Sequence, residues 1–516
     1  MADGIPQAEG GIRLGMPAGR WILFAAVLGS SMAMLDSTVV NVALPTIGRD
    51  LHTSLGGLQW TVTAYTLTLA GLILLGGSLG DRMGRRRIFI TGVVWFAVSS
   101  ALCGLSPDIG VLIAARALQG VGGALLTPGS LAIIQASFAS DDRPRAIGAW
   151  SGLGGVAGAA GPLLGGWLVG AAGWRWIFLI NLPLAVLVVL VALRHVPETK
   201  DPSAHGRFDV TGALLAALAL AGITDALIEA PVSGAVLIVV PAVTGVAAGV
   251  AFVMVERRRG RHGADGPVPP MLPLEVFASR QFSAVNLVTF VVYAALGAVF
   301  FLLVLELQVV SGFSPLEAGL ALVPATVLML LLSARSGALA QRVGPRWVMT
   351  GGILTSAAGL LLLTRIGPHA SYLADVVPGV AVFGLGLSAT VAPLTATVLA
   401  SADVRHAGVA SGVNNAVARA AGLLSVAGLP LAVGLTGAGL TATAFESGFR
   451  TAMVVCAALL VAGAVLSAVT IDINVLRPPA GRTVREPECL TFCGVGAPPL
   501  EPADRPVIAV PGPAQH

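Results

Sequence analysis

Between two long apolar runs lies the stretch Gly77-Ser-Leu-Gly-Asp81-Arg82-Met-Gly84-Arg85-Arg86. It returns in altered form as Gly337-Ala-Leu-Ala-Gln341-Arg342-Val-Gly344-Pro-Arg346, with the same spacing of Gly, Leu, Arg, Gly and Arg. A polar pattern that recurs at the same place in a series of apolar segments indicates two related halves. The fold class then depends on what those apolar segments are.

The composition answers that question. The 516 residues are 55% hydrophobic and only 11% charged, and the mean hydropathy is +0.87. A water-soluble domain carries about 25% charged residues, so this chain needs the lipid bilayer as its solvent and partner. Its 30 basic and 26 acidic residues stand in short clusters between apolar runs. This placement indicates membrane topology and argues against nucleic acid as a partner.

About fourteen apolar stretches are long enough, at about 20 residues each, to cross about 30 Å of hydrocarbon as helices. The first continues past Asp36 to Leu44, so we expect a retained span and not a cleaved signal peptide. The expected spans cover residues 21 to 45, 58 to 79, 88 to 106, 109 to 136, 146 to 170, 174 to 194, 209 to 230, 233 to 255, 282 to 310, 315 to 339, 347 to 366, 372 to 400, 407 to 434 and 450 to 472.

Basic residues gather in alternate loops, and such loops stay on the cytoplasmic side during insertion. Four arginines follow the second span and five lie between residues 256 and 281, whereas the opposite loops keep only Arg49, Arg175, Arg365 and Arg450. We therefore expect both termini in the cytoplasm and the chain in the plasma (inner) membrane.

The two copies of the loop pattern are about eight spans apart, which two six-helix bundles and one inserted helix pair would explain. The expected parts are an N-terminal cytoplasmic segment (1-20), an N-terminal six-helix bundle (21-194), an inserted transmembrane helix pair (195-256), a cytoplasmic linker (257-281), a C-terminal six-helix bundle (282-472) and a flexible cytoplasmic tail (473-516).

Asp36 lies deep in the first span, where a charge costs from about 2.5 kcal/mol upward. Such a charge is retained where it serves a structural ion pair or where it exchanges a proton on a transport path, and the sequence leaves both readings open. Arg116 is deep in the fourth span, and Gln119 shares its helix face. Arginine does not readily lose its proton, so we expect Arg116 to act on a nearby carboxyl electrostatically.

Other polar residues in the spans are weaker candidates, because charges near helix ends can reach the interface. Glu306 is the best of them, and we group it with Asp36 and Arg116 as a candidate for proton coupling. Arg419 is deeply placed near Asn414 and Asn415, with pairing equally possible. The remaining candidates are Gln308, Asp225, Glu229 and Arg335.

Glycine and proline suggest moving parts. Gly158, Gly161 and Gly165 recur at helical spacing and would give the fifth span a flat face, while Pro162 can bend it. In the loop pattern, Gly77 and Gly84 would permit a sharp turn. Asp81 could then face the positive end of a helix in the other half as a latch. For the glycines of the fifth span, the alternative is ordinary tight packing. For the loop, the alternative is that its arginines only set the membrane topology.

Cysteine and histidine suggest no metal or catalytic centre. Cys103 and Cys456 lie in apolar runs, and Cys489 and Cys493 lie in the polar tail, so free thiols are expected. All seven histidines fall in loops or tails. We expect no cofactor, no metal and no enzymatic activity.

Six patterns, in order, resemble the major facilitator superfamily and, within it, the fourteen-span drug:proton antiporters. The resemblance covers about residues 21 to 472. Leu35 to Pro45, which includes Asn41, and Trp60 to Tyr65 look like subgroup motifs of the first two spans. Gly77 to Arg86 is similar to the gating-loop motif, and Arg116 to Gly120 to the proton-transfer motif of the fourth span. The run through Gly158, Gly161, Pro162, Gly165 and Gly166 resembles the antiporter motif, and Trp174 to Pro183 resembles the start of the sixth span.

Two departures matter. Ala157 stands where the antiporter motif usually has Gly, and Gln341 replaces the acid in the second loop. Only the first loop, with Asp81, Arg82, Gly84, Arg85 and Arg86, should then act as a full gate.

The resemblance implies an exporter that works by alternating access, in which inward proton flow through Asp36, tuned by Arg116, drives out an amphipathic small molecule. The proton is the coupling ion, and we expect a monomer. A cavity lined by Asn41, Gln59, Tyr65, Gln119 and Asn414 is a speculative substrate site. A proton-coupled symporter for a nutrient or metabolite is the alternative on the same fold.

Overall fold

The computed structural model describes residues 11–201, 208–230, 235–261, 268, 270–402, 407–435 and 442–476. Fourteen helices in these ranges are long and apolar enough to cross a membrane, and the ranges contain no sheet, only a single bridge between Ile12 and Phe138. The expected all-helical membrane fold class and the span count are thereby confirmed, while the cytoplasmic location of both termini stays a prediction. Most of the predicted tail and part of the predicted linker, together with Cys489 and Cys493, lie outside the described residues.

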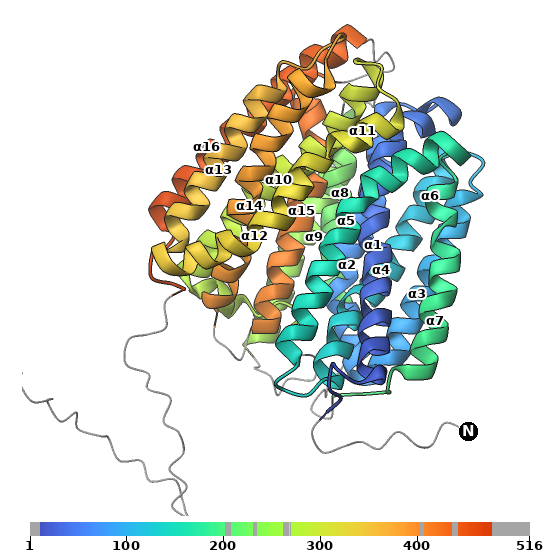
Figure 1. Ribbon diagram of the computed structural model, residues 1–516, viewed down its shortest axis with the longest axis vertical. Helices are drawn as coiled ribbons and strands as arrows, with labels where there is room; N and C mark the ends of the chain where they lie inside the picture. The colour runs from blue at the N-terminus through green and yellow to red at the C-terminus, as the bar shows by residue number, and fades with distance from the viewer. Residues whose placement is uncertain are drawn as a thin grey trace, which may run out of the picture. The chain divides into compact units, whose positions relative to one another are not determined.

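The helices divide into two six-span bundles and an additional pair (Figure 1). The first bundle contains α1 (Pro17–Asp50), α2 (Leu55–Met83), α3 (Arg85–Gly104), α4 (Ile109–Ser137), α5 (Arg143–Ala172), α6 (Trp176–Leu179) and α7 (Asn181–His195). The pair is α8 (Val210–Glu229) and α9 (Ala235–Gly260). The second bundle follows a short helix η1 (Leu274–Ala278) and contains α10 (Arg280–Val309), α11 (Pro315–Ala321), α12 (Val323–Val343), α13 (Pro345–Leu363), η2 (Tyr372–Val376), α14 (Val377–Ala400), α15 (Ala407–Ala432) and α16 (Ala442–Thr470).

The tenth expected span is broken into α11 and α12, and a proline explains the break. Pro324 has no N–H for the carbonyl of Leu320, four residues earlier. Tyr372 from η2 donates its hydroxyl to that carbonyl at 3.0 Å. In contrast, Pro45 does not end the first span, because α1 continues to Asp50. The last span begins at Ala442, eight residues before the predicted 450.

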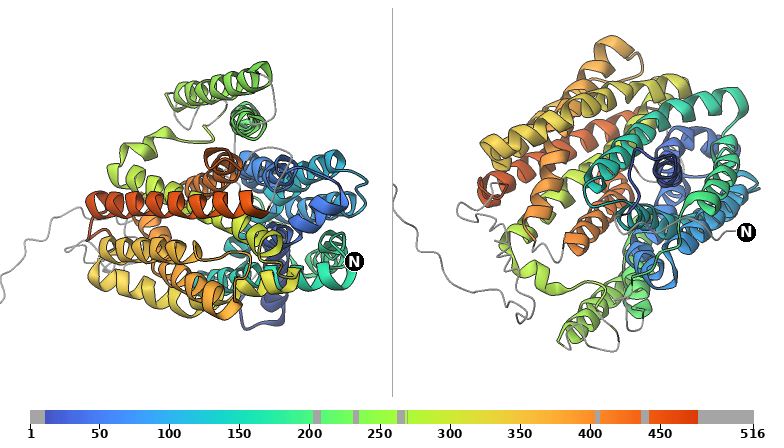
Figure 2. Two further views of the ribbon diagram at one scale, coloured as in Figure 1. Left: turned by 90° about the horizontal axis from the view of Figure 1, so that it is seen from above. Right: turned by 60° about the horizontal axis from the view of Figure 1, so that its bottom comes forward.

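The inserted pair packs on itself and against both bundles. Gly222 of α8 and Gly245 of α9 approach so closely that a Cβ on either would lie within 3 Å of the other helix's backbone. α8 also contacts α2 and α15, one helix from each bundle. α9 has only 11% of its most apolar window buried, the lowest share of the fourteen spans, and it lies at the edge of the molecule (Figure 2).

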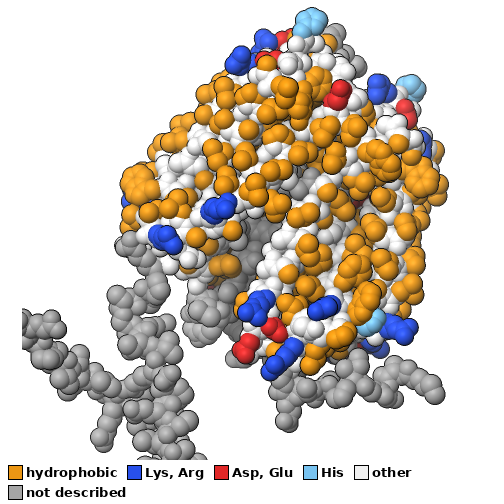
Figure 3. Space-filling view, viewed as in Figure 1, with side chains coloured by type: hydrophobic (Ala, Val, Ile, Leu, Met, Phe, Trp, Pro, Cys, Tyr) orange, Lys and Arg blue, Asp and Glu red, His pale blue; other side chains and the backbone are white. Residues whose placement is uncertain are grey.

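The bundles pack together at one end and leave a hollow between them toward the other, where α2 and α15 stay in contact. We call the end that carries Gly84 the loop end, and the end that carries Trp174 the far end. At the far end, Gly166 of α5 packs against Pro315 of α11, and Gln308 donates to the Val42 carbonyl at 2.9 Å. Toward the loop end, α5 residues such as Gly158 face open space, and a hollow separates the halves (Figure 3). The structure is therefore closed at the far end and open at the loop end.

The repeated loop pattern has a shared geometric cause. Gly84 links α2 to α3 with φ +118°, and Gly344 links α12 to α13 with φ +95°. Only glycine adopts such angles readily, so both halves use glycine at the same turn. The prediction that Gly77 belongs to this turn is wrong, because Gly77 lies inside α2 and faces Pro128. One residue with positive φ is sufficient for the turn.

Candidate functional site

Asp36 and Arg116 form an ion pair inside the first bundle. Their exposed fractions are 2% and 1%, and the guanidinium Nη1 donates to Asp36 Oδ2. The other carboxylate oxygen accepts a hydrogen bond of 2.8 Å from the Gln119 amide. The cost of burying the acid is thus offset by a charge and two donors, as a buried ion pair requires.

The arginine has acceptors besides the acid. Its Nε donates to the Thr61 carbonyl of α2 at 3.1 Å, and Nη1 also donates to Gln119 Oε1 at 2.7 Å. Its guanidinium carbon lies 4.4 Å from the centre of the Tyr65 ring and 5.7 Å from that of Phe178, as in cation–π contacts. Arg116 can therefore stay bound in place when Asp36 loses its charge.

The pair belongs to a wider polar network that the sequence did not reveal. Gln119 donates to the Ser100 hydroxyl at 3.1 Å, and Asn181 donates to the same hydroxyl at 3.0 Å. Ser100 in turn donates to the Phe178 carbonyl at 2.9 Å. The Cys103 thiol lies 3.6 Å from Gln119 Oε1 and is free, as is Cys456. The only sequence signal for Ser100 and Asn181 was a polar residue in an apolar run, which many structural positions share.

The proposed cavity residues fall in different places. Tyr65 and Gln119 are sealed in the network just described. Gln59 closes the far end, because its amide donates to the Val426 carbonyl at 2.7 Å and to the Ala427 carbonyl at 3.1 Å in α15. Asn41 and Asn414 are half-buried, and Asn414 accepts from Thr289 at 2.8 Å. In this conformation Tyr65, Gln119 and Gln59 do not border open space.

Glu306 is not part of this network. It lies in α10 near the far end, is fully buried, and neither carboxyl oxygen has a hydrogen-bond partner in the described chain. Glu446 and Arg450 are near enough to act on it electrostatically, but they pair with each other at 2.6 Å. Burying a carboxyl without a partner is costly, so packing alone does not explain why an acid stands at position 306.

Asp81 is not a latch between halves in this structure. Its Oδ1 accepts from Arg85 Nε at 2.9 Å and from Nη2 at 2.8 Å, within its own loop. Among the described residues, the Asp81 carboxylate accepts no hydrogen bond from a helix of the second bundle. The expected contact across the halves is thus not made in this conformation.

The gating loop is instead tied to the segment that follows α7. Arg85 N–H donates to the Thr199 carbonyl at 2.9 Å, and Asp201 N–H donates to the Asp81 carbonyl at 2.9 Å. Glu198 accepts from the Arg86 N–H at 3.1 Å. The Arg82 guanidinium makes a further contact with this segment, because its carbon lies 4.5 Å from the centre of the Phe208 ring, as in a cation–π contact.

The glycine-rich face of α5 serves two partners. A Cβ on Gly161 would lie 1.9 Å from Thr38 Oγ1, and one on Gly165 would lie 3.1 Å from the Val39 carbonyl, so both glycines admit α1. Gly166 instead lets α11 of the other bundle approach closely. In the same contact, a Cβ built on Gly319 of α11 would lie 2.2 Å from the Pro162 carbonyl of α5. Gly158, with nothing within 4 Å, joins neither contact.

A second charged cluster anchors the inserted pair at the loop end. Asp209 accepts from Arg259 of α9 and, at 2.6 Å, from the Gly212 N–H at the start of α8. Burial opposes the charged carboxylate, but hydrogen bonds with Glu256, Gly212 and Arg259 outweigh it and hold the pKa of Asp209 below its usual range. This cluster links α8 to α9 and plays a positioning role.

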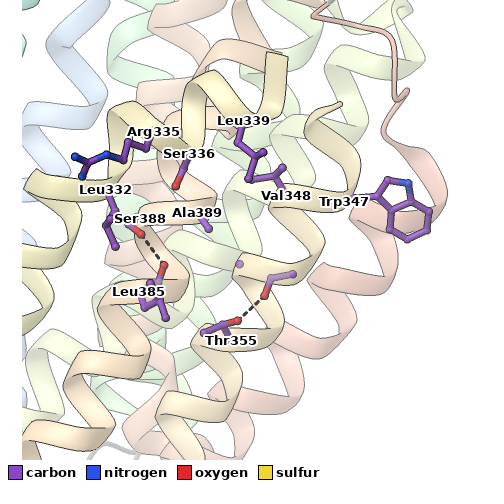
Figure 4. Close-up of a pocket in the computed structure, with 12 residues that line it drawn as sticks. Leu332, Arg335, Ser336, Leu339, Trp347, Val348, Thr355, Leu385, Ser388 and Ala389 are labelled. Atoms are coloured by element: carbon purple, nitrogen blue, oxygen red, sulfur yellow. Dashed lines mark hydrogen bonds between the residues drawn. The ribbon is translucent and has the colours of Figure 1, made fainter. Parts of the chain in front are cut away.

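A pocket of about 460 Å³ lies elsewhere, among α12, α13 and α14 (Figure 4). Arg335, one of the weaker candidates from the sequence, lines this pocket and donates to the Leu331 carbonyl at 3.1 Å. Ser388 and Thr355 each donate to the backbone of their own helix. Because these hydroxyls are already satisfied, the pocket lacks the converging polar groups of a specific site.

Comparisons with known proteins agree with this architecture. The family model described as Major Facilitator Superfamily matches residues 26–426. The puromycin resistance protein pur8 of Streptomyces alboniger is 37% identical over 415 residues, which are 79% of this chain and 80% of that protein. The probable actinorhodin transporter of Streptomyces coelicolor is 36% identical, over 84% and 76%. The tetracenomycin C resistance and export protein of Streptomyces glaucescens is 34% identical, over 78% and 74%.

Solved structures show the same fold at low identity. A bacterial homologue of the human lysosomal transporter Spinster, in an inward-facing and occupied conformation, gives a TM-score of 0.64 at 18% identity and covers 90% of this chain and 100% of its own. An auto-inhibited POT family peptide transporter gives 0.65 at 17%, covering 87% and 96%.

Proposed function

The chain belongs to the Major Facilitator Superfamily, and from that premise we propose that it is a proton-coupled antiporter that exports amphipathic small molecules. It is an integral membrane transporter and not an enzyme, and its curated relatives include antibiotic and multidrug resistance exporters. The proton coupling, the direction of transport and the kind of cargo are the parts that need separate support.

The observation that carries the proposal is the buried pair of Asp36 and Arg116. Arg116 also donates to two acceptors that do not depend on the charge of Asp36, the Thr61 carbonyl and Gln119 Oε1. When a proton neutralises Asp36, the guanidinium retains these bonds and α1 is released from its charge contact with α4. Proton binding would thereby change how tightly two helices of the first bundle are held.

Alternating access gives this change a function. We place the loop end in the cytoplasm of a cell whose plasma membrane contains the chain as a monomer, so that the hollow in Figure 3 accepts cargo from inside. Each proton that enters down about 100 mV supplies about 2.3 kcal/mol, enough for roughly a fiftyfold concentration ratio. No cofactor is required, because the proton is the coupling ion.

Glu306 fits the proposal as a second proton-binding residue. It is sealed without a partner on the closed side, where a carboxylate would be far more costly than a protonated acid. Opening of the far end would expose it to the outside, where it could release or collect a proton.

The test compares the intact chain with Asp36→Asn in inside-out membrane vesicles from a host that lacks other pumps. A proton gradient should drive uptake of a fluorescent amphipathic drug by the intact chain, and a protonophore should stop it. Asp36→Asn should bind the drug but lose at least 90% of the gradient-driven uptake.

Two outcomes contradict the proposal. Undiminished gradient-driven uptake by Asp36→Asn would show that the pair is structural. If the gradient drove the compound out of these vesicles, transport in cells would be inward and the symporter alternative would hold.

A further inference from the structure

Arg419 is a positive charge at the middle of the contact between the two bundles. On α15, Gly412, Asn415, Arg419 and Val426 are three or four residues apart or multiples of this spacing, so they share one face of the helix. The two ends of that face touch α2 of the other bundle: a Cβ on Gly412 would lie 2.8 Å from Leu74, and Val426 accepts from Gln59. Arg419 therefore points toward the first bundle, about 10 Å along the helix from either contact.

This arginine has no acidic partner among the residues that the structure describes. Its Nε donates to Asn415 Oδ1 at 2.8 Å, and no other hydrogen bond or ion pair of its side chain is found in those ranges. It is half-buried, and its terminal nitrogens are not among the sealed unpartnered atoms, so they face open space. The acids that could have balanced it are engaged or enclosed, since Asp36 is paired with Arg116 and Glu306 is fully buried.

Two tyrosines lie near Arg419, the buried Tyr65 and the half-buried Tyr293. The Arg419 charge acts electrostatically on the hydroxyls of Tyr65 in α2 and of Tyr293 in α10. The Tyr65 hydroxyl is used, because it donates to the Ala33 carbonyl at 3.3 Å. The Tyr293 hydroxyl makes no hydrogen bond to any described residue and is not sealed. The guanidinium and this free hydroxyl thus come from two helices of the second bundle that pack together, since a Cβ on Gly422 of α15 would lie 3.8 Å from the Tyr293 carbonyl.

An arginine at mid-membrane depth is tolerated where its charge is balanced by an opposite charge or solvated by water. A guanidinium is also the side chain best suited to bind carboxylate-like groups. We infer that Arg419, aided by Tyr293, binds an ionised acidic group of the exported compound, such as a carboxylate, sulfonate or phenolate. The inference rests on the proposed export function and specifies its substrate class as amphipathic organic anions.

The charge balance supports this substrate class. Exchange of one proton inward for one anion outward moves two charges in the direction that an inside-negative potential favours, or about 4.6 kcal/mol per 100 mV. Exchange for a monovalent cation moves no net charge, so the potential would contribute nothing. Anion export is therefore expected to speed up with membrane potential.

The experiment uses three fluorescent probes with one apolar body: 1-pyrenesulfonate, the neutral 1-pyrenesulfonamide and the cationic 1-pyrenemethylamine. Gradient-driven uptake into inside-out vesicles is measured for the full chain, Arg419→Gln, Arg419→Lys, Tyr293→Phe and the control Arg335→Gln. Arg419→Gln should lower sulfonate uptake at least tenfold and change sulfonamide uptake less than twofold. Arg419→Lys should keep at least a third of sulfonate uptake, Tyr293→Phe should lower it two- to fivefold, and Arg335→Gln should match the parent.

A measurement on the unmodified protein covers the case in which Arg419→Gln fails to fold. Sulfonate should raise the melting temperature of the purified parent more than sulfonamide does. Equal protection by the two probes, an equal loss of both transport activities in Arg419→Gln, or unchanged sulfonate uptake would overturn the inference. If none of the three probes responded to a proton gradient while a lipophilic drug was also unmoved, the proposed function itself would fail.

Discussion

At the scale of single residues, the buried acids of this transporter fall into two classes. Asp36 has a charge partner, an amide donor and a fixed geometry. Glu306 has none of these, although it is even less exposed. A partnered acid is expensive to disturb, whereas an unpartnered acid is expensive to keep. The second class is therefore a sharper indicator of function, since packing alone would favour its replacement.

This contrast predicts that Glu306→Met stabilises the protein. Methionine has a similar length and no polar atom to desolvate, so the free energy of unfolding should rise by about 1–3 kcal/mol. Gradient-driven export should fall at the same time, because the second proton-binding residue is lost. Thermal unfolding of the purified protein and vesicle transport measure the two effects. Glu306→Gln, which keeps a polar group, is the control and should not stabilise; a destabilised Glu306→Met would show that Glu306 has a structural partner.

Gly84 gives a prediction about backbone conformation. Alanine there would have to adopt φ +118°, and its Cβ would lie 2.5 Å from Glu198 Oε1. The strain costs about 1–3 kcal/mol, so Gly84→Ala should lower both the melting temperature and the export rate. Gly80→Ala is the matched control, because it lies in α2 with nothing within 4 Å and alanine is the better helix former. Equal behaviour of the two variants would contradict the role of the turn.

The sequence identified single residues better than it identified their neighbours. Asp36 and Arg116 were found because a charge in an apolar run is rare, and their pairing confirms that they are close. Ser100 and Asn181 were missed because a hydroxyl or amide in a span is common, and only the crossing of α3 with α7 brings them together. Gln59 was assigned to a cavity, yet its contact with α15 depends on how the bundles meet.

At the scale of helices, small residues decide which spans can touch. Gly161 of α5 packs on Thr38 of α1, and a Cβ would approach Thr38 Oγ1 to 1.9 Å. Gly161→Ala must rotate Thr38 or separate the helices, which costs about 1–3 kcal/mol. Gly158→Ala, one turn earlier with open space around it, should leave stability within about 0.5 kcal/mol of the parent. Denaturation of both variants in detergent tests this, and a destabilised Gly158→Ala would indicate a closed loop end in solution.

The inserted pair should depend on Asp209. Because the pKa of Asp209 is lowered in the folded protein, its contribution to stability is present at neutral pH and is lost as the pH falls through that lowered pKa. Asp209→Asn should cost about 1.5–3 kcal/mol at pH 7, the value of hydrogen bonds to a charged group. It should also flatten the acid side of the melting-temperature profile. Asp141→Asn, an exposed acid, is the control; parallel profiles for Asp209→Asn and the parent would refute the assignment.

At the scale of the whole molecule, the sequence predicted the number of spans and the repeat but not the conformation. Fourteen spans follow from fourteen apolar runs, because hydrocarbon thickness fixes helix length. Which end is closed depends on side-chain contacts between bundles, such as Gln308 with the Val42 carbonyl. These contacts involve residues about 270 positions apart, and no local pattern specifies such a pairing. An alternating transporter has at least two sets of these contacts, so one sequence must encode both.

The far-end contact can be shifted with one methyl group. A Cβ on Gly166 would lie 2.4 Å from the Pro315 carbonyl of the opposite bundle, so Gly166→Ala should disfavour the closed far end by about 1–3 kcal/mol. That free energy changes the ratio of closed to open molecules by roughly 5- to 150-fold. A cysteine placed at the buried Val426, in a background without reactive thiols, should then react faster with an impermeant maleimide added from the far side. Gly170→Ala, one turn along α5 with nothing within 4 Å, should react like the parent. If both alanine variants kept Val426→Cys protected, the bundles would not separate at Gly166, and the alternation would have to pivot elsewhere.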